Sequence, residues 1–97
     1  MAMLDSVKSA LRISQSNLAF DEEVSDLIAA ARNDLRISGV LSAKVEDDTD
    51  ALIKRAITVY CKANFGFDNP DAEKLTDSYN MLKAHLTLSQ EYTVGDA

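Results

Sequence analysis

The residue types most often used for catalysis and metal binding are scarce in this sequence. His85 is the only histidine and Cys61 the only cysteine among 97 residues. A general base at His85 would need a nucleophile and an orienting carboxylate from other segments. A structural zinc site needs more nitrogen and sulfur ligands than this pair can supply within one chain. We therefore expect His85 to be a surface or interface side chain and Cys61 to be a small hydrophobic one.

Acidic residues are concentrated between positions 46 and 50, and hard cations such as calcium prefer several carboxylates. The cluster consists of Glu46, Asp47, Asp48 and Asp50. It lacks the glycine and the closing glutamate that an EF-hand loop requires. We interpret it as a solvated linker ending in a helix N-cap at Asp48, Thr49 or Asp50. No glycine-rich phosphate loop or nucleophile elbow occurs either, so the sequence predicts no catalytic residues, no cofactor and no metal.

Lys54, Arg55 and Lys62 fall on one face of a predicted helix and form the one basic stripe of an acidic sequence. Two interpretations remain open for this stripe. It can be the solvated face that lies opposite an apolar face in most surface helices. It can also pair with an acidic surface on a neighbouring copy or on another protein.

Several hydrophobic residues are further candidates for contact with a partner. Phe65 and Phe67 flank Gly66 in a predicted loop, where an aromatic side chain can cap the core or anchor a partner. We expect one phenylalanine in each role, and the sequence does not distinguish them. Met81 and Leu88 lie opposite the main apolar stripe of their predicted helix, which suggests that this helix has a second partner.

The spacing of apolar residues predicts an all-α fold, a compact bundle of about four helices. Apolar residues recur at helical intervals, and only three glycines and one proline interrupt the pattern. The predicted helices cover about residues 3–12, 20–39, 50–64 and 70–88, with Gly39 as a left-handed C-terminal cap and Asn69 as an N-cap before Pro70. Residues 1–97 are expected to form a single domain whose tail, about 89–97, is disordered or ordered by a partner.

Each predicted helix has a core-facing stripe. These stripes comprise Leu4, Val7 and Leu11 in the first helix; Phe20, Val24, Leu27, Ile28, Ala31 and Leu35 in the second; Leu52, Ile53, Ala56, Ile57, Val59, Tyr60 and Ala63 in the third; and Leu75, Tyr79, Leu82 and Leu86 in the fourth. The third stripe is wider than one packing seam requires, so we expect the third helix to be central.

Composition limits the possible partners. The net charge is −6 and the pI is near 4.5, so the average surface repels phosphates and tight nucleic-acid binding is disfavoured. The apolar runs are too short for a membrane span, and a lone cysteine requires no oxidising compartment. We expect a protein that acts without membrane attachment.

Four segments of the sequence resemble the small helical head–tail connector proteins of tailed bacteriophages, which are also described as DNA-packaging or head-completion proteins. The segments are "MLDSVKSALRIS", "DEEVSDLIAAARNDLRISGV", "ALIKRAITVYCKANFG" and "YNMLKAHLTLSQEY", and together they extend from Met3 to about Tyr92. The resemblance implies a virion protein, assembled in the host cytoplasm, that forms a ring beneath the portal after DNA packaging. It implies the portal and a tail-completion protein as partners, and no catalytic residues. The sequence departs from longer members in its short tail and compact middle linker.

We therefore predict a structural, non-enzymatic connector that self-associates and lets DNA pass without sequence-specific binding. The predicted interface comprises Lys54, Arg55, Lys62, Phe65, Phe67, Met81 and Leu88. One alternative is a small acidic helical regulator that binds a single protein target. A DNA-binding helix pair is a second alternative, disfavoured because no helix concentrates base-reading residues on a strongly basic face.

Overall fold

The computed structural model describes residues 2–66 and 68–94, and within them the chain is helical with no strand. The helices are α1 (Met3–Ala10), α2 (Asp21–Ile37), α3 (Ser42–Val45), α4 (Ala51–Asn64), α5 (Ala72–Leu88) and α6 (Gln90–Thr93). The prediction of an all-α fold with four main helices is confirmed. The molecule measures 44 × 27 × 18 Å along its principal axes.

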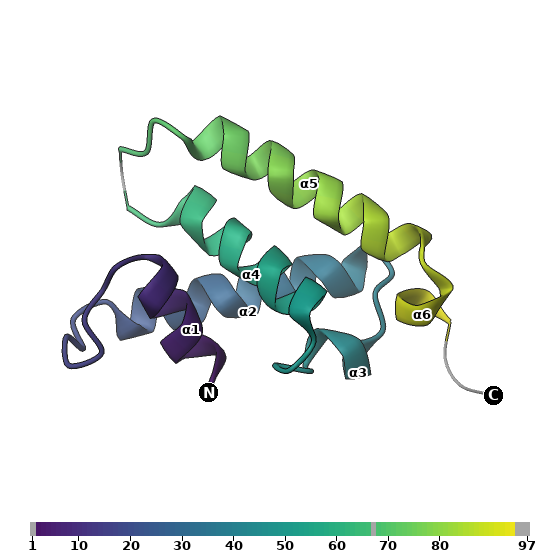
Figure 1. The fold of residues 1–97 in the computed structure, drawn as a ribbon, viewed down its shortest axis with the longest axis horizontal. Helices are drawn as coiled ribbons and strands as arrows, with labels where there is room; N and C mark the ends of the chain where they lie inside the picture. Colours follow the sequence, from purple (N-terminus) through teal and green to yellow (C-terminus); the bar gives the residue numbers. More distant parts are fainter. Residues whose placement is uncertain (1, 67, 95–97) are drawn as a thin grey trace.

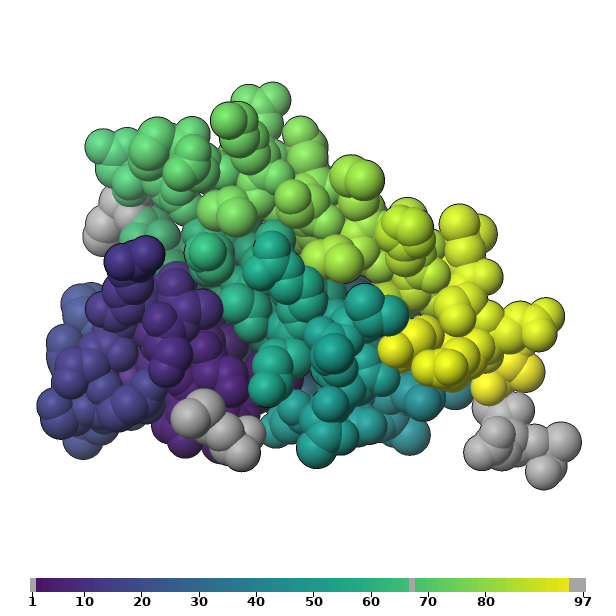
Figure 2. Space-filling model, in the orientation of Figure 1, coloured from purple at the N-terminus to yellow at the C-terminus, as the bar shows by residue number. Residues whose placement is uncertain are grey.

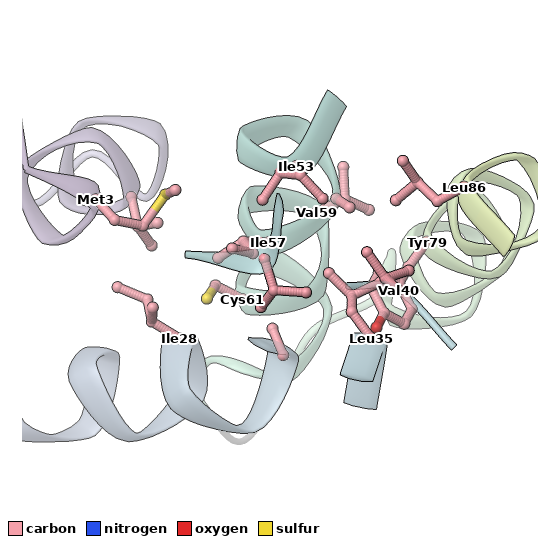
Figure 3. Packing of buried hydrophobic residues seen from close by; sticks show 14 of the residues in the cluster. Met3, Ile28, Leu35, Val40, Ile53, Ile57, Val59, Cys61, Tyr79 and Leu86 are labelled. Atoms are coloured by element: carbon pink, nitrogen blue, oxygen red, sulfur yellow. The ribbon is translucent and has the colours of Figure 1, made fainter. Parts of the chain in front are cut away.

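Helix α4 is central, as its wide apolar stripe predicts (Figure 1). It packs against α5 on one side and against α2 and α1 on the other, while α6 packs on α5 and α3 on α2. Figure 3 shows side chains from α1, α2, α4 and α5 meeting in one core, among them Met3, Ile28, Ile57 and Leu86. The surfaces of α4 and α5 that remain outside this core are therefore available to partners.

The N-cap of α4 is Asp50, one of the three predicted candidates. Its carboxylate accepts hydrogen bonds from the backbone N–H groups of Leu52 and Ile53 at 3.0 and 3.1 Å, which satisfies two of the unpaired donors at the start of a helix. The predicted burial of Leu52 is wrong, since this side chain is 45% exposed. Val59 and Ala63, further along the same side of α4, are buried. Neighbouring helices therefore cover this side of α4 at Val59 and Ala63 but not at Leu52 in its first turn.

Helix α2 ends at Ile37 and is capped by Gly39, as predicted. Gly39 has φ +115°, its N–H donates to the carbonyl of Arg36, and the N–H of Val40 donates to the carbonyl of Leu35, each at 3.0 Å. This is the Schellman arrangement, which uses a left-handed residue to satisfy the last carbonyls of a helix. The predicted stripe of α2 is buried at Val24, Ile28, Ala31 and Leu35, whereas Leu27 is half-buried and Phe20 is 39% exposed.

The predicted start of the last long helix is wrong by two residues. Its N-cap is Asp71 rather than Asn69, and Pro70 lies in the preceding turn. The Asn69 side chain accepts from the N–H of Asp71 at 3.0 Å and donates to the carbonyl of Lys62 at 2.7 Å. These two bonds hold residues 69–71 in a turn against the end of α4.

Two short helices replace the linker and part of the tail that the sequence predicts. Helix α3 lies within the predicted linker, and α6 lies within the predicted disordered tail. Tyr92 of α6 is buried, its hydroxyl donates to the Asp50 carboxylate at 2.9–3.0 Å, and its carbonyl accepts from the N–H of Leu41 at 2.8 Å. Residues 90–93 are therefore docked on the bundle, and residues 95–97 lie outside the described part of the chain.

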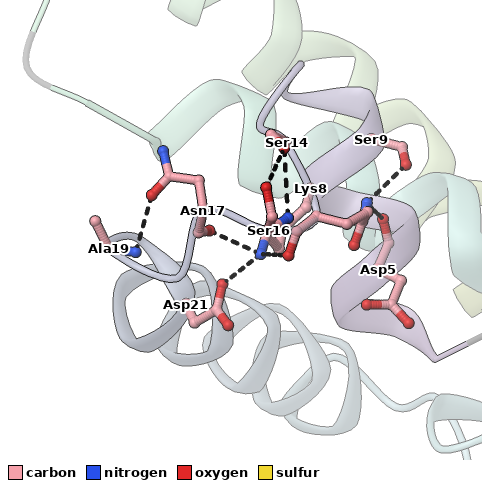
Figure 4. Close-up of polar contacts among 9 residues, drawn as sticks. Asp5, Lys8, Ser9, Ser14, Ser16, Asn17, Ala19 and Asp21 are labelled. Atoms are coloured by element: carbon pink, nitrogen blue, oxygen red, sulfur yellow. Dashed lines mark hydrogen bonds and ion pairs between the residues drawn. The ribbon is translucent and has the colours of Figure 1, made fainter.

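Lys8 is a buried lysine that the sequence analysis did not identify. It is only 2% exposed, and its ammonium group donates to the carbonyls of Gln15 and Asn17 at 3.3 and 2.9 Å. An ion pair of 2.7 Å with Asp21 completes its contacts (Figure 4). These three partners match the three donors of a lysine, so Lys8 joins α1, the following loop and the start of α2.

Candidate interaction surface

Two predicted interface residues, Arg55 of α4 and Met81 of α5, line a shallow groove of about 270 Å³ between the two helices. The groove is lined by Arg55 and Val59 of α4 and by Ser78, Met81, Leu82 and His85 of α5. The structure therefore brings together Arg55 and Met81, which are 26 positions apart in the sequence. A cationic side chain beside apolar ones is a combination that is frequent in protein interfaces.

The basic stripe of α4 has no acidic partner within residues 2–66 and 68–94. The ion pairs found there use Lys8, Arg32, Arg36 and Lys83 as cations. Lys54, Arg55 and Lys62 enter none of them; Arg55 is exposed, and the two lysines are half-buried. The stripe therefore keeps its positive charge available on an acidic protein.

Met81 and Leu88 present apolar side chains to solvent. Met81 is 65% exposed and Leu88 is 85% exposed, whereas Leu86 on the core side of the same helix is buried. Leu88 lies in the last turn of α5, beyond the groove. Helix α5 therefore has an apolar component on its outer side as well as on its core side.

The two phenylalanines of the predicted interface are not equivalent in the structure. Phe65 is half-buried, packs against the core and meets Phe20 edge to face, with ring centroids 5.5 Å apart. It lies at the end of α4, away from the groove residues. Phe67 lies outside the described residues. Phe65 thus takes the capping position, and a partner contact at Phe67 stays a prediction.

His85 and Cys61 occupy the environments that the sequence suggests. His85 is exposed at the groove. Cys61 is buried, and burial raises the pKa of its thiol to about 12, which keeps it protonated and poorly nucleophilic near neutral pH. Within the part of the chain that the structure describes, no group of histidine, cysteine and acidic side chains is arranged to hold a metal ion.

The acidic cluster is partly neutralised by arginines of α2. Arg32 donates to the carbonyl of Val45 at 2.6 Å and to the carboxylate of Asp48 at 2.8 Å, and Arg36 pairs with Glu46. The sequence analysis did not connect these two arginines with the acidic cluster. Their spacing of four residues, which places both on one face of α2, was the available signal. The cluster serves to attach α3 and its loop to α2.

A second polar site joins α2 to α5. Asp34 accepts hydrogen bonds from the Tyr79 hydroxyl at 2.6 Å and from Lys83 at 3.0 Å. Burial raises the pKa of Asp34, but these two bonds outweigh burial and leave it below its usual value. Burial and the bond to Asp34 both raise the pKa of Tyr79. The polar groups of Asp34, Tyr79 and Lys83 form hydrogen bonds with one another, so we interpret this cluster as a contact between helices α2 and α5.

In the described part of the chain, no helix combines the length and apolar character needed to cross a membrane. Neither the curated proteins nor the solved structures contain a match to the chain. A family model described as phage connector protein matches residues 3–93. Because this match extends from the first residue of α1 to the last residue of α6, the chain belongs to the family of phage connector proteins.

Proposed function

We propose that the protein is a structural head–tail connector that assembles as a ring beneath the phage portal after DNA packaging. In this role it extends the DNA channel and offers a platform for the tail-completion protein. The match of nearly the whole chain to a connector family supports the role. The observation that carries the proposal is the combination, on α4 and α5, of basic residues with no ion pair among the described residues and of exposed apolar residues.

The proposed contact surface consists of Lys54, Arg55, Lys62, Met81 and Leu88, with the exposed part of Phe65 at the end of α4 and with Phe67, which follows α4 in the sequence. A closed ring requires two different patches on each copy, because each subunit contacts one neighbour with one patch and the other neighbour with the second. Residues that are charged or apolar, exposed and unpaired within their own chain are suited to such contacts.

DNA would pass through this connector as cargo. A net charge of −6 repels phosphates, so a channel wall built from this chain would not hold the DNA as it passes. Retention of the purified protein on a DNA column at low salt, lost at high salt, would contradict this part of the proposal.

Electron microscopy of the purified protein with and without its portal tests the function directly. Rings, or portal particles with an added ring of density, are the expected result. Light scattering across a concentration series gives the accompanying mass. A complex of one copy with one unrelated protein target, with no ring under either condition, would instead support an acidic regulator.

Reversal of the basic stripe tests the proposed surface. We expect Lys54→Glu, Arg55→Glu and Lys62→Glu, combined in one chain, to leave the helical circular dichroism unchanged, because none of the three side chains has an ion-pair partner within the described residues. Ring formation should be impaired. Unchanged ring formation would assign the stripe to plain solvent exposure.

A further inference from the structure

An acidic surface with apolar neighbours lies at the start of α2. Glu22, Glu23 and Asp26 are exposed and, with Ala19 and Leu27, line a broad depression of about 470 Å³. The adjoining loop adds two exposed apolar side chains, Leu18 at 68% and Phe20 at 39%. We call the three carboxylates and their apolar neighbours, Leu18, Ala19, Phe20 and Leu27, the α2 patch.

The carboxylates of the α2 patch form no ion pair among the described residues. The neighbouring Asp21 forms an ion pair with Lys8. Glu23 accepts only a long hydrogen bond of 3.4 Å from the N–H of Gly66. No cation among residues 2–66 and 68–94 therefore neutralises the three carboxylates.

The groove and the α2 patch are distant from each other on one molecule. Helix α2 begins beside α1, at the end of the molecule drawn in blue and purple in Figures 1 and 2. The groove is built from the middle of α4 and from the middle and second half of α5, so it lies nearer to α6 than the start of α2 does. One copy cannot place its own patch in its own groove, but two copies arranged head to tail can.

We propose that the α4–α5 groove of one copy binds the α2 patch of the next copy. Arg55, which lines the groove, would meet the carboxylates, and Met81 and Leu82 would meet the apolar residues beside α2. Lys54 and Lys62 of the same helix, which are half-buried and lie outside the groove, would add positive charge near it. This pairing rests on the proposed ring assembly and names its two patches. The pairing also explains how a chain of charge −6 can self-associate. Copies with the same net charge repel each other on average, but a contact that brings opposite charges together is attractive.

Charge exchange between the two patches tests the pairing. Arg55→Glu alone and Asp26→Arg alone should each weaken association by about tenfold, because each replaces an attraction by a repulsion. The double variant should recover association, and so should an equal mixture of the two single variants, in which one interface is native and the other is exchanged. Sedimentation at low and high salt gives the association constants.

Disulfide trapping provides a second readout that detects weak association. Cys61 is buried, so introduced surface cysteines dominate the oxidation chemistry. A chain with both Arg55→Cys and Asp26→Cys should form a ladder of cross-linked multimers, whereas each single cysteine variant should not. Asp26→Cys combined with Lys74→Cys is the matched control, since Lys74 is exposed on α5 but lies outside the groove.

The outcomes separate this pairing from the proposed function. If rings form but neither charge reversal weakens them, or if Asp26→Arg has no effect while Arg55→Glu does, the pairing is wrong and the connector function stands. If the unmodified chain forms no multimers at any concentration, alone or with portal, both proposals fail together.

Discussion

Lys8 is a charged side chain that folding has removed from water, and its partners explain how. Two of its three acceptors are backbone carbonyls of the loop that follows α1, and the third is Asp21 at the start of α2. This site could not be predicted from the sequence, because every residue type has a backbone carbonyl and the positions of these carbonyls depend on the path of the loop. A buried lysine is tolerated only when all its donors are satisfied.

Replacing Lys8 by methionine should destabilise the protein. The substitution keeps most of the side-chain volume but leaves Asp21 without its cation, so we expect a loss of about 2–4 kcal/mol in the free energy of unfolding. Urea denaturation followed by circular dichroism measures the change. Lys74→Met on the exposed side of α5 should change it by less than about 0.5 kcal/mol. An unchanged midpoint for Lys8→Met would mean that desolvation cancels the gain from the ion pair.

At the scale of helices, the sequence predicts what several turns of periodicity can show. The four long helices were predictable because each repeats its apolar stripe, as α2 does from Val24 to Leu35. Helices α3 and α6 have four residues each, too few for a period to be recognised. Their positions depend on tertiary contacts, such as those of Tyr92 with Asp50, which join residues 42 positions apart. The groove was unpredictable for the same reason, although Arg55 and Met81 were individually identified.

Helices α1 and α2 end in the same geometry but with different residues, which allows a matched test. Arg12 has φ +63° at the position that Gly39 occupies after α2, and the N–H of Ile13 donates to the carbonyl of Lys8 at 2.9 Å. A left-handed conformation costs a non-glycine residue about 1–2 kcal/mol, part of which glycine loses again in chain entropy. Arg12→Gly should therefore raise the stability by about 0.5 kcal/mol.

Gly39→Ala is the opposite change and should lower the stability by about 1–2 kcal/mol. A Cβ atom there would meet nothing within 4 Å, so the cost comes from the backbone alone. Thermal unfolding of both variants tests the pair. A loss of stability in Arg12→Gly would show that the arginine side chain contributes more than its backbone conformation costs.

Because α6 is docked through Tyr92, the free energy of unfolding should decrease as the pH rises in the alkaline range. Burial, together with the bond to Asp50, raises the pKa of Tyr92 from 10.0 to about 12, and burial also raises that of Tyr79. The unfolded chain then loses its phenolic protons at lower pH than the folded chain. The stabilisation is fully present below pH 10.0 and is lost as the pH rises toward 12.

Tyr92→Phe should flatten this decline, while costing about 1 kcal/mol at neutral pH. Urea titrations at several alkaline pH values check both effects, and an unchanged slope would argue against the Tyr92–Asp50 bond.

The whole molecule divides its charges between two uses. Arg32, Arg36, Lys8 and Lys83 pair within the chain and attach loops and helices to one another. Lys54, Arg55 and Lys62 remain unpaired within the described residues, as do Glu22, Glu23 and Asp26 at the start of α2. Charges of the first kind attach parts of the fold to one another, and we propose that those of the second kind determine how copies approach one another.

The same division applies to the apolar residues of α5, and it can be tested by paired substitutions on one helix. Met81→Ser and Leu88→Ser alter side chains that are 65% and 85% exposed, so the free energy of unfolding should change by less than about 0.5 kcal/mol. Leu86→Ala, on the buried side, should lower it by about 2–5 kcal/mol. Assembly should respond in the reverse order. At a temperature where all variants are folded, Met81→Ser should weaken ring formation, because Met81 lines the groove, whereas Leu86→Ala should assemble normally. If Met81→Ser assembled as well as the unmodified chain while Leu86→Ala did not, association would depend on the stability of the fold and not on the outer side of α5.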